Sequence, residues 1–171
     1  MAPVNFIFLA NRGNLTKRQL YRDISNRLRR EPGSQTVSYD PSRARPKRVV
    51  SSFDPDIFLS RQYGVSDARL ETNFWFPSEV NHEYYEIEWI EPGRNLGVGW
   101  HQDRTHPSLG NCHFQIDHNG RTVCREGAVF LDRHPLNVLE ARLEQLRSLL
   151  PALDWTGASA SLPESGIPTP P

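Results

Sequence analysis

Apolar and polar residues alternate along the middle of the chain. In residues 67–76 the alternate positions that share one face are apolar except for Thr72, and in residues 83–91 they are Tyr85, Ile87 and Trp89. This alternation is the period of a half-buried β-strand. Shorter stretches continue the pattern at residues 97–103, 111–118 and 122–126. Neighbouring strands joined by short connections pair antiparallel, so the pattern predicts an antiparallel meander of about four to five strands.

Two other segments have the spacing of helices. In residues 16–30 the apolar side chains recur every four residues at Leu20, Ile24 and Leu28, and Thr16 begins a capping-box spacing. In residues 135–150 a leucine stripe follows a proline suited to a first helical turn. We expect this closing helix to cover one face of the sheet, which makes the fold class α+β.

Composition divides the chain into three parts. Residues 1–52 form a basic helical arm whose end, residues 34–52, contains SRARPKR and is expected to be an exposed linker. Residues 53–155 hold the predicted sheet and closing helix. Residues 156–171 are rich in Pro, Ser and Gly and are expected to be disordered, because they cannot bury enough surface to offset their ordering entropy.

The formal net charge of zero hides an uneven distribution. Residues 1–50 hold 11 Lys and Arg against 3 Asp and Glu, whereas the rest of the chain holds 9 against 17. The basic arm favours an anionic partner, with RNA as the first candidate; the alternative is that it docks on its own acidic body. No apolar run reaches the roughly 18 residues that span a bilayer, so we expect no membrane partner, a cytoplasmic location and two reduced cysteines.

Four of the six histidines lie within 18 residues, at positions 101, 106, 113 and 118. If residue 103 pairs with residue 111, His101 lies directly opposite His113, with the two Cβ atoms about 5 Å apart. Strand alternation then places both imidazoles on the polar face of the sheet. Asp103 of the same strand shares that face. So do carboxylates and a tryptophan of the neighbouring strands, namely Glu71, Trp75, Glu86 and Glu88.

Two imidazoles on one face suit the cleavage of RNA without a metal or other cofactor. One activates the 2′-hydroxyl and the other protonates the leaving oxygen, so His101 and His113 are the predicted acid/base pair. Asp103 and His106 complete the catalytic group, and His106 and Arg104 are expected to bind phosphate. We also expect Trp75 to stack a base and the arm to guide RNA through Arg18, Arg22, Arg29 and Arg30.

Three alternatives stand beside this hypothesis. His101, Asp103, His106 and His113 are also suitable ligands for zinc or manganese. Histidines on an exposed sheet face can also be no more than solvated residues. Finally, the chain can be a non-enzymatic module that binds nucleic acid or protein through the basic arm.

Three stretches of the chain resemble a known family. HPSLGNCHF with DRHPLNVLEARLEQLRSLL, together with FDPDIFLSRQYGVSDARLETNFWFP, is similar to the TumE-like toxins of TumE–TumA toxin–antitoxin modules over residues 53–150. The resemblance implies a small RNA-cleaving toxin that a cognate antitoxin protein neutralises. By position, His106 and His113 correspond to the histidines of that family, and Asp103 and Arg104 flank them. The basic arm has no counterpart in that family.

Overall fold

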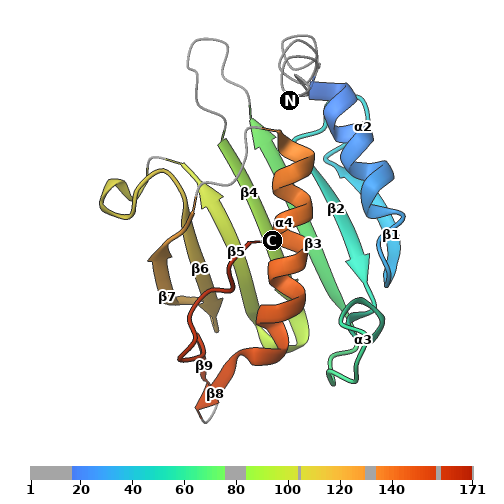
Figure 1. Cartoon of the computed structure of the whole chain (residues 1–171). Coiled ribbons are helices and arrows are strands. Elements are labelled where there is room, and N and C mark those ends of the chain that lie inside the picture. The colour runs from blue at the N-terminus through green and yellow to red at the C-terminus, as the bar shows by residue number, and fades with distance from the viewer. Residues whose placement is uncertain (1–16, 76–83, 104, 130–133, 157–158, 171) are drawn as a thin grey trace, which may run out of the picture.

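The computed structural model describes residues 17–75, 84–103, 105–129, 134–156 and 159–170. Its centre is one antiparallel sheet of seven strands that lie side by side in chain order (Figure 1). The strands are β1 Ser34–Asp40, β2 Arg48–Phe53, β3 Ala68–Trp75, β4 Tyr84–Glu91, β5 Leu96–Gln102, β6 His113–His118 and β7 Arg121–Gly127. The α+β class and the meander are therefore confirmed, but the expected count of four to five strands is too low.

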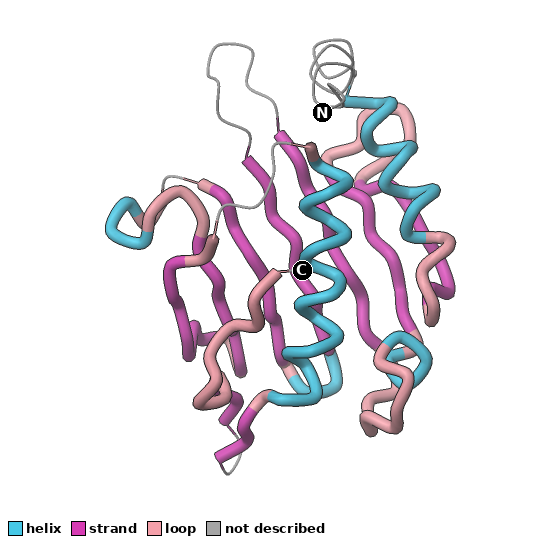
Figure 2. The backbone as a smooth tube through the Cα atoms, in the orientation of Figure 1, coloured by secondary structure: helices cyan, strands magenta, loops and turns pink. Residues whose placement is uncertain are grey.

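Two helices cover one face of the sheet. Helix α2 spans Lys17–Leu28 and helix α4 spans Pro135–Leu149, and both lie on the same side in Figures 1 and 2. The short helix α3, Pro55–Phe58, follows β2. The part of the chain that the structure describes also contains three single 3-10 turns, at Pro92–Arg94, Pro107–Leu109 and Leu150–Ala152. Among the described residues, no helix is long and apolar enough to cross a membrane.

The core lies between these helices and the sheet. Apolar side chains that recur every three or four residues along α2 and α4 are fully buried, as the spacing predicted; they are Leu20, Ile24, Leu28, Leu139, Leu143 and Leu146. They pack on the inward-facing residues of the strands, which include Leu70, Ile87, Trp89, Trp100 and Phe114. The opposite face of the sheet carries the polar residues of each strand, so the molecule has one helical side and one open side.

The prediction that residues 34–52 form an exposed linker is wrong. This segment forms β1 and most of β2, which pair with each other and extend the sheet from β3. Alternate residues of β2 are buried, but the middle one of these is Ser51, so the apolar period is broken in the sequence. One basic residue of the segment is neutralised in the fold, because Arg48 pairs with both Asp40 and Glu71.

The expectation that residues 156–171 are disordered is also wrong for those that the structure describes. Strands β8 (Asp154–Thr156) and β9 (Ser159–Ser161) form a small hairpin, and Ala160 is 1% exposed. Gln145 of α4 donates a hydrogen bond of 2.6 Å to the carbonyl of Pro168. These contacts hold the described part of residues 156–171 against the fold, although its composition alone predicts disorder.

A buried carboxylate joins α2 to α4. The Glu31 side chain is 1% exposed and pairs with Arg27 at 2.6 Å and with Arg147 of α4. Arg27 also reaches Glu140 of α4, with Nη2 2.7 Å from Oε2. Glu31 therefore receives two arginines at the point where the two helices meet.

Glu31→Gln is expected to lower the free energy of unfolding by about 2 kcal/mol, because it leaves two partly buried guanidinium groups without their shared anion. Urea denaturation measures the change. Glu144→Gln is the matched control: it also pairs with Arg147, but its side chain is 57% exposed, so its cost should stay below about 0.5 kcal/mol. Equal effects of the two substitutions would contradict this role of Glu31.

Candidate active site

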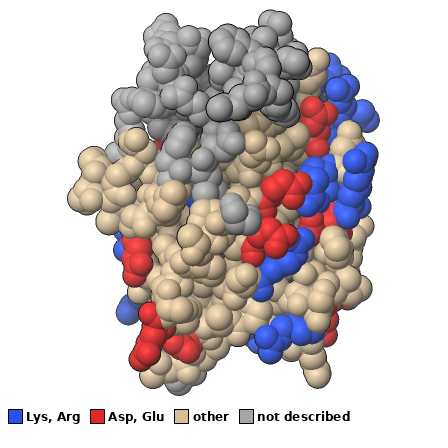
Figure 3. Space-filling view, viewed as in Figure 1, with Lys and Arg blue, Asp and Glu red and all other residues tan. Residues whose placement is uncertain are grey.

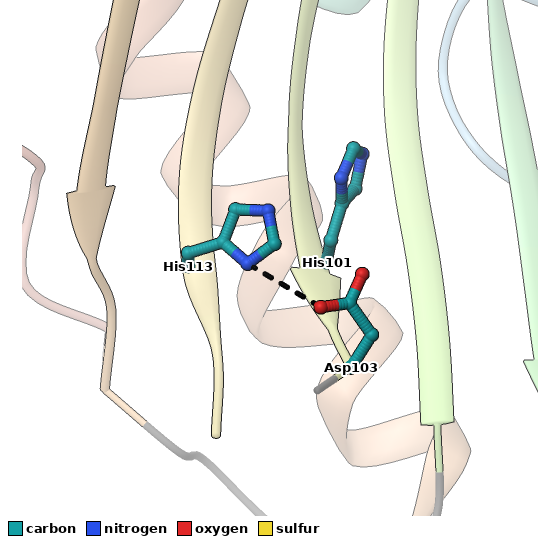
Figure 4. Close-up of side chains that lie close together, drawn as sticks. All are labelled: His101, Asp103 and His113. Carbon is teal, nitrogen blue, oxygen red and sulfur yellow. Dashed lines mark ion pairs between the residues drawn. The ribbon is translucent and has the colours of Figure 1, made fainter. Parts of the chain in front are cut away.

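The open side of the sheet brings His101 and His113 together. His101 of β5 is the direct cross-strand partner of His113 of β6, which confirms the register predicted from the sequence. Their ring centroids are 5.1 Å apart and the ring planes are nearly perpendicular, at 81°. Figure 4 shows both rings on the side of the sheet away from α4.

Asp103 completes this group from the end of β5. One carboxylate oxygen lies 3.8 Å from Nδ1 of His113 (Figure 4). The same oxygen accepts hydrogen bonds from the backbone N–H of Thr105 at 3.0 Å and from its hydroxyl at 2.7 Å. Partial burial opposes ionisation, but the Thr105 hydrogen bonds and the neighbouring imidazoles outweigh it and lower the pKa of Asp103. Asp103 is therefore an anion that faces His113.

His113 is buried although it lies on the open side. Its side chain is 3% exposed, and the ring of His106 packs edge-on against it with centroids 4.9 Å apart. Burial lowers the pKa of His113, against the effect of Asp103 and with that of His101 and His106. The ring is consequently neutral at pH 7, and His113 is not a solvated surface residue.

A pair of glycines on β5 makes room for a carboxylate beside the histidines. A Cβ atom on Gly97 would lie 2.8 Å from Oε1 of Glu88, and one on Gly99 would lie 2.6 Å from the carbonyl oxygen of Ile87. The Glu88 side chain therefore lies over β5 at the two positions where glycine has no side chain. Burial raises its pKa to about 7, and the nearby carboxylates add to the effect.

The raised pKa of Glu88 predicts that the free energy of unfolding decreases as the pH rises. A pKa of about 7 in the fold, against about 4.3 in the unfolded chain, means that the folded state holds an extra proton between these values. The stability that this proton contributes is lost from about pH 4.5 to pH 7 and amounts to roughly 3–4 kcal/mol, at about 1.36 kcal/mol per pKa unit. Urea denaturation should show that Glu88→Gln is more stable than the wild type at pH 8 and not at pH 4.5. A constant difference across this range would contradict the assignment.

The remaining predicted residues are divided between the two sides of the molecule. Trp75 lies at the end of β3 on the open side and is 46% exposed. Arg104 lies outside the described residues. The arginines of the arm are placed elsewhere: Arg18 and Arg22 lie on α2, and Arg29 and Arg30 directly follow it, so all four belong to the helical side. They do not meet the histidines.

The structure therefore brings together His101, Asp103, His106 and His113. Within this group, ligand atoms of His101, Asp103 and His113 all lie within 4.8 Å of one another, so these three residues can also hold a metal ion. The sequence placed Glu88 on the histidine face but did not assign it a role in the site. The signal for it was the pair of glycines at alternate positions of a strand, Gly97 and Gly99, which leaves one face of that strand bare.

The chain matches no family model, no curated protein and no solved structure. The resemblance to TumE-like toxins remains a prediction, and the site is interpreted from the residues of this chain.

Proposed function

We propose that this protein cleaves RNA phosphodiester bonds, with His101 and His113 as the acid/base pair. The observation that carries the proposal is their cross-strand pairing at 5.1 Å between ring centroids. The two rings lie in different environments, because His113 is buried and His101 is half-buried. Environments that separate two titratable groups suit one of them as base and the other as acid.

In the proposed reaction, neutral His113 accepts the proton of the ribose 2′-hydroxyl. The 2′-oxygen attacks the adjacent phosphorus, the bond from phosphorus to the 5′-oxygen breaks, and protonated His101 gives its proton to that leaving oxygen. The products are a 2′,3′-cyclic phosphate and a 5′-hydroxyl. Asp103, 3.8 Å from Nδ1 of His113, favours the tautomer with the proton on Nδ1 and leaves Nε2 free to accept one.

The burial of His113 limits how a substrate can reach its ring. His101 is the more exposed member of the pair, so the substrate enters from its side. The ring of His106 packs against His113, and it must move before a 2′-hydroxyl reaches the buried ring. Catalytic contacts that form only in the substrate complex are common in enzymes.

Charge for the phosphate comes from Arg125 in addition to the predicted Arg104. Arg125 of β7 donates to Gln115 at 2.8 Å, and its charge acts on His113. The other arginines described on this face, Arg48 and Arg69, are both paired with Glu71. Arg125 is therefore the described arginine that we assign to phosphate binding, the role predicted for Arg104 and His106.

Incubation of the purified protein with a short RNA tests the proposal. We expect fragments that end in a 2′,3′-cyclic phosphate, formed without added metal and in the presence of a chelator. Intact RNA would overturn it. The proposal includes toxicity and a cognate antitoxin that neutralises it. Expression of the wild-type protein in a bacterial host should therefore arrest growth and degrade RNA. Expression of the His113→Ala variant should leave both growth and RNA unchanged.

A second candidate function is nucleic-acid binding on the helical side without catalysis. The observation that favours it is a pocket of about 250 Å³ lined by Arg18, Arg22, Arg43 and Tyr39, where α2 meets the β1–β2 connection. Figure 3 shows Lys and Arg gathered along this part of the helical side.

The salt dependence of RNA binding tests this second candidate. Each lost phosphate contact lowers the slope of log affinity against log salt by about 0.7 for a single strand. The double substitution Arg18→Glu, Arg22→Glu should therefore weaken binding strongly at low salt and flatten the slope. Arg61→Glu, an exposed arginine outside this pocket, is the control. An unchanged slope in the double variant would exclude the pocket as the binding site.

A further inference from the structure

We propose that His101, Asp103 and His113 form a binding site for a divalent transition metal ion such as zinc, and that the bound ion inhibits the histidine pair. The metal-binding part stands on the geometry alone, and the inhibition rests on the proposed function. Two imidazoles and one carboxylate are a ligand set that zinc prefers, with a fourth position left for water.

The three ligand groups are already close together. Their ligand atoms all lie within 4.8 Å of one another. Around a tetrahedral zinc ion with bonds of about 2.0–2.2 Å, ligand atoms lie roughly 3.4 Å apart. Small side-chain rotations of the half-buried His101 and Asp103 toward His113 close this difference, and the backbone of the paired strands stays in place.

The fold holds these groups in position without the ion. The antiparallel register fixes His101 opposite His113, and two hydrogen bonds from Thr105 hold the carboxylate of Asp103. His106 also packs against the ring of His113. Ligands that are ordered before binding lose little entropy when the ion arrives.

The charges around the group favour a cation. Glu86 is the direct cross-strand partner of His101 on β4, which places a carboxylate where it can orient a ligating imidazole. Glu88 and Asp117 lie farther along the same face. Two arginines described on this face, Arg48 and Arg69, are paired with Glu71. Arg125 opposes a cation, because its charge also acts on His113. The carboxylates of Asp103 and Glu86 are the anionic groups that offset it next to the ligand atoms.

Metal binding and acid/base catalysis use the same electron pairs. An imidazole nitrogen that is bonded to zinc can neither accept a proton from the 2′-hydroxyl nor carry one to the leaving oxygen. Only coordination bonds form, and they are reversed when the metal is removed. Zinc is thus expected to act as a reversible inhibitor, and a chelator as an activator.

Titration of the full-length protein with Co²⁺ tests the site directly. We expect one equivalent to bind with the visible absorption of tetrahedral cobalt, and Zn²⁺ to displace it. His113→Gln and Asp103→Asn should weaken the binding at least 10-fold. His118→Gln is the control, because this histidine of the same strand lies on the helical side against Trp155. Circular dichroism confirms that each variant is folded.

Several results would overturn the inference. Absence of the cobalt spectrum in the wild type, or equal cobalt affinity in folded His113→Gln and the wild type, would exclude the site. Zinc binding without any loss of RNA cleavage would exclude the inhibition. A protein that binds cobalt at these residues but cleaves no RNA would uphold the metal site and overturn the proposed function, so the two proposals fail separately.

Discussion

Replacing His113 by Gln is expected to lower the rate of RNA cleavage by about 10²- to 10⁴-fold, the range typical of one acid/base group. Gln keeps a polar side chain of similar length but cannot exchange a proton near pH 7. The wild-type ring is neutral and faces Asp103, and it is buried. Water therefore cannot take over as the base when the imidazole is removed. Single-turnover cleavage of a short RNA measures the loss, and thermal denaturation shows that the variant is folded.

His118→Gln is the matched control for this prediction. His118 belongs to the same strand, but its ring packs against Trp155, with centroids 5.6 Å apart, on the helical side. Cleavage by this variant should stay within a few-fold of the wild type. Equal rates for His113→Gln and the wild type would remove His113 from the mechanism.

Gly33→Ala is expected to cost about 4 kcal/mol of unfolding free energy, the largest stability effect in this account. Gly33 follows the arm helix with φ of +82°, and a Cβ atom there would lie 2.6 Å from the carbonyl oxygen of Asp54 and 2.7 Å from the nitrogen of Phe58. Left-handed strain contributes about 1–2 kcal/mol and the backbone overlap about 1–3 kcal/mol. Urea denaturation measures the sum.

Gly120→Ala separates the two contributions. Gly120 has a similar φ of +73°, but a Cβ atom there meets nothing within 4 Å. Only the conformational strain remains, so we expect a cost of about 1 kcal/mol. If both substitutions cost the same, the contact between Gly33 and the start of α3 contributes nothing to stability.

The central strands and the closing helix were predictable because their side chains follow a clean period. Strand alternation fixed which face His101 and His113 occupy, and the tight turn at Asn119 and Gly120, both with positive φ, fixed the pairing of the last two strands. Strands β1 and β2 were missed because serine and arginine interrupt the apolar period. In the fold, Ser51 is buried and Arg48 is neutralised by carboxylates of neighbouring strands, and neither fact is visible in the sequence.

The histidine group was predictable, but its surroundings were only partly so. The arm helix carries an apolar stripe that must pack on the apolar face of the sheet, and this argument alone places its arginines away from the polar histidine face. The burial of His113 depends on the segment that follows β5, whose course no periodicity predicts. The raised pKa of Glu88 depends on its position over Gly97 and Gly99, which becomes visible only when strands β4 and β5 are paired.

The most direct test of the proposed acid/base chemistry compares two substrates that differ in one atom. A short RNA and the same RNA with a 2′-deoxynucleotide at the cleaved position are incubated with the wild-type protein and a chelator. We expect the RNA to be cut to a 2′,3′-cyclic phosphate and the deoxy substrate to stay intact at that position, because the nucleophile is missing. Equal cleavage of both substrates, or none of either, would contradict an acid/base role for His101 and His113 in RNA cleavage.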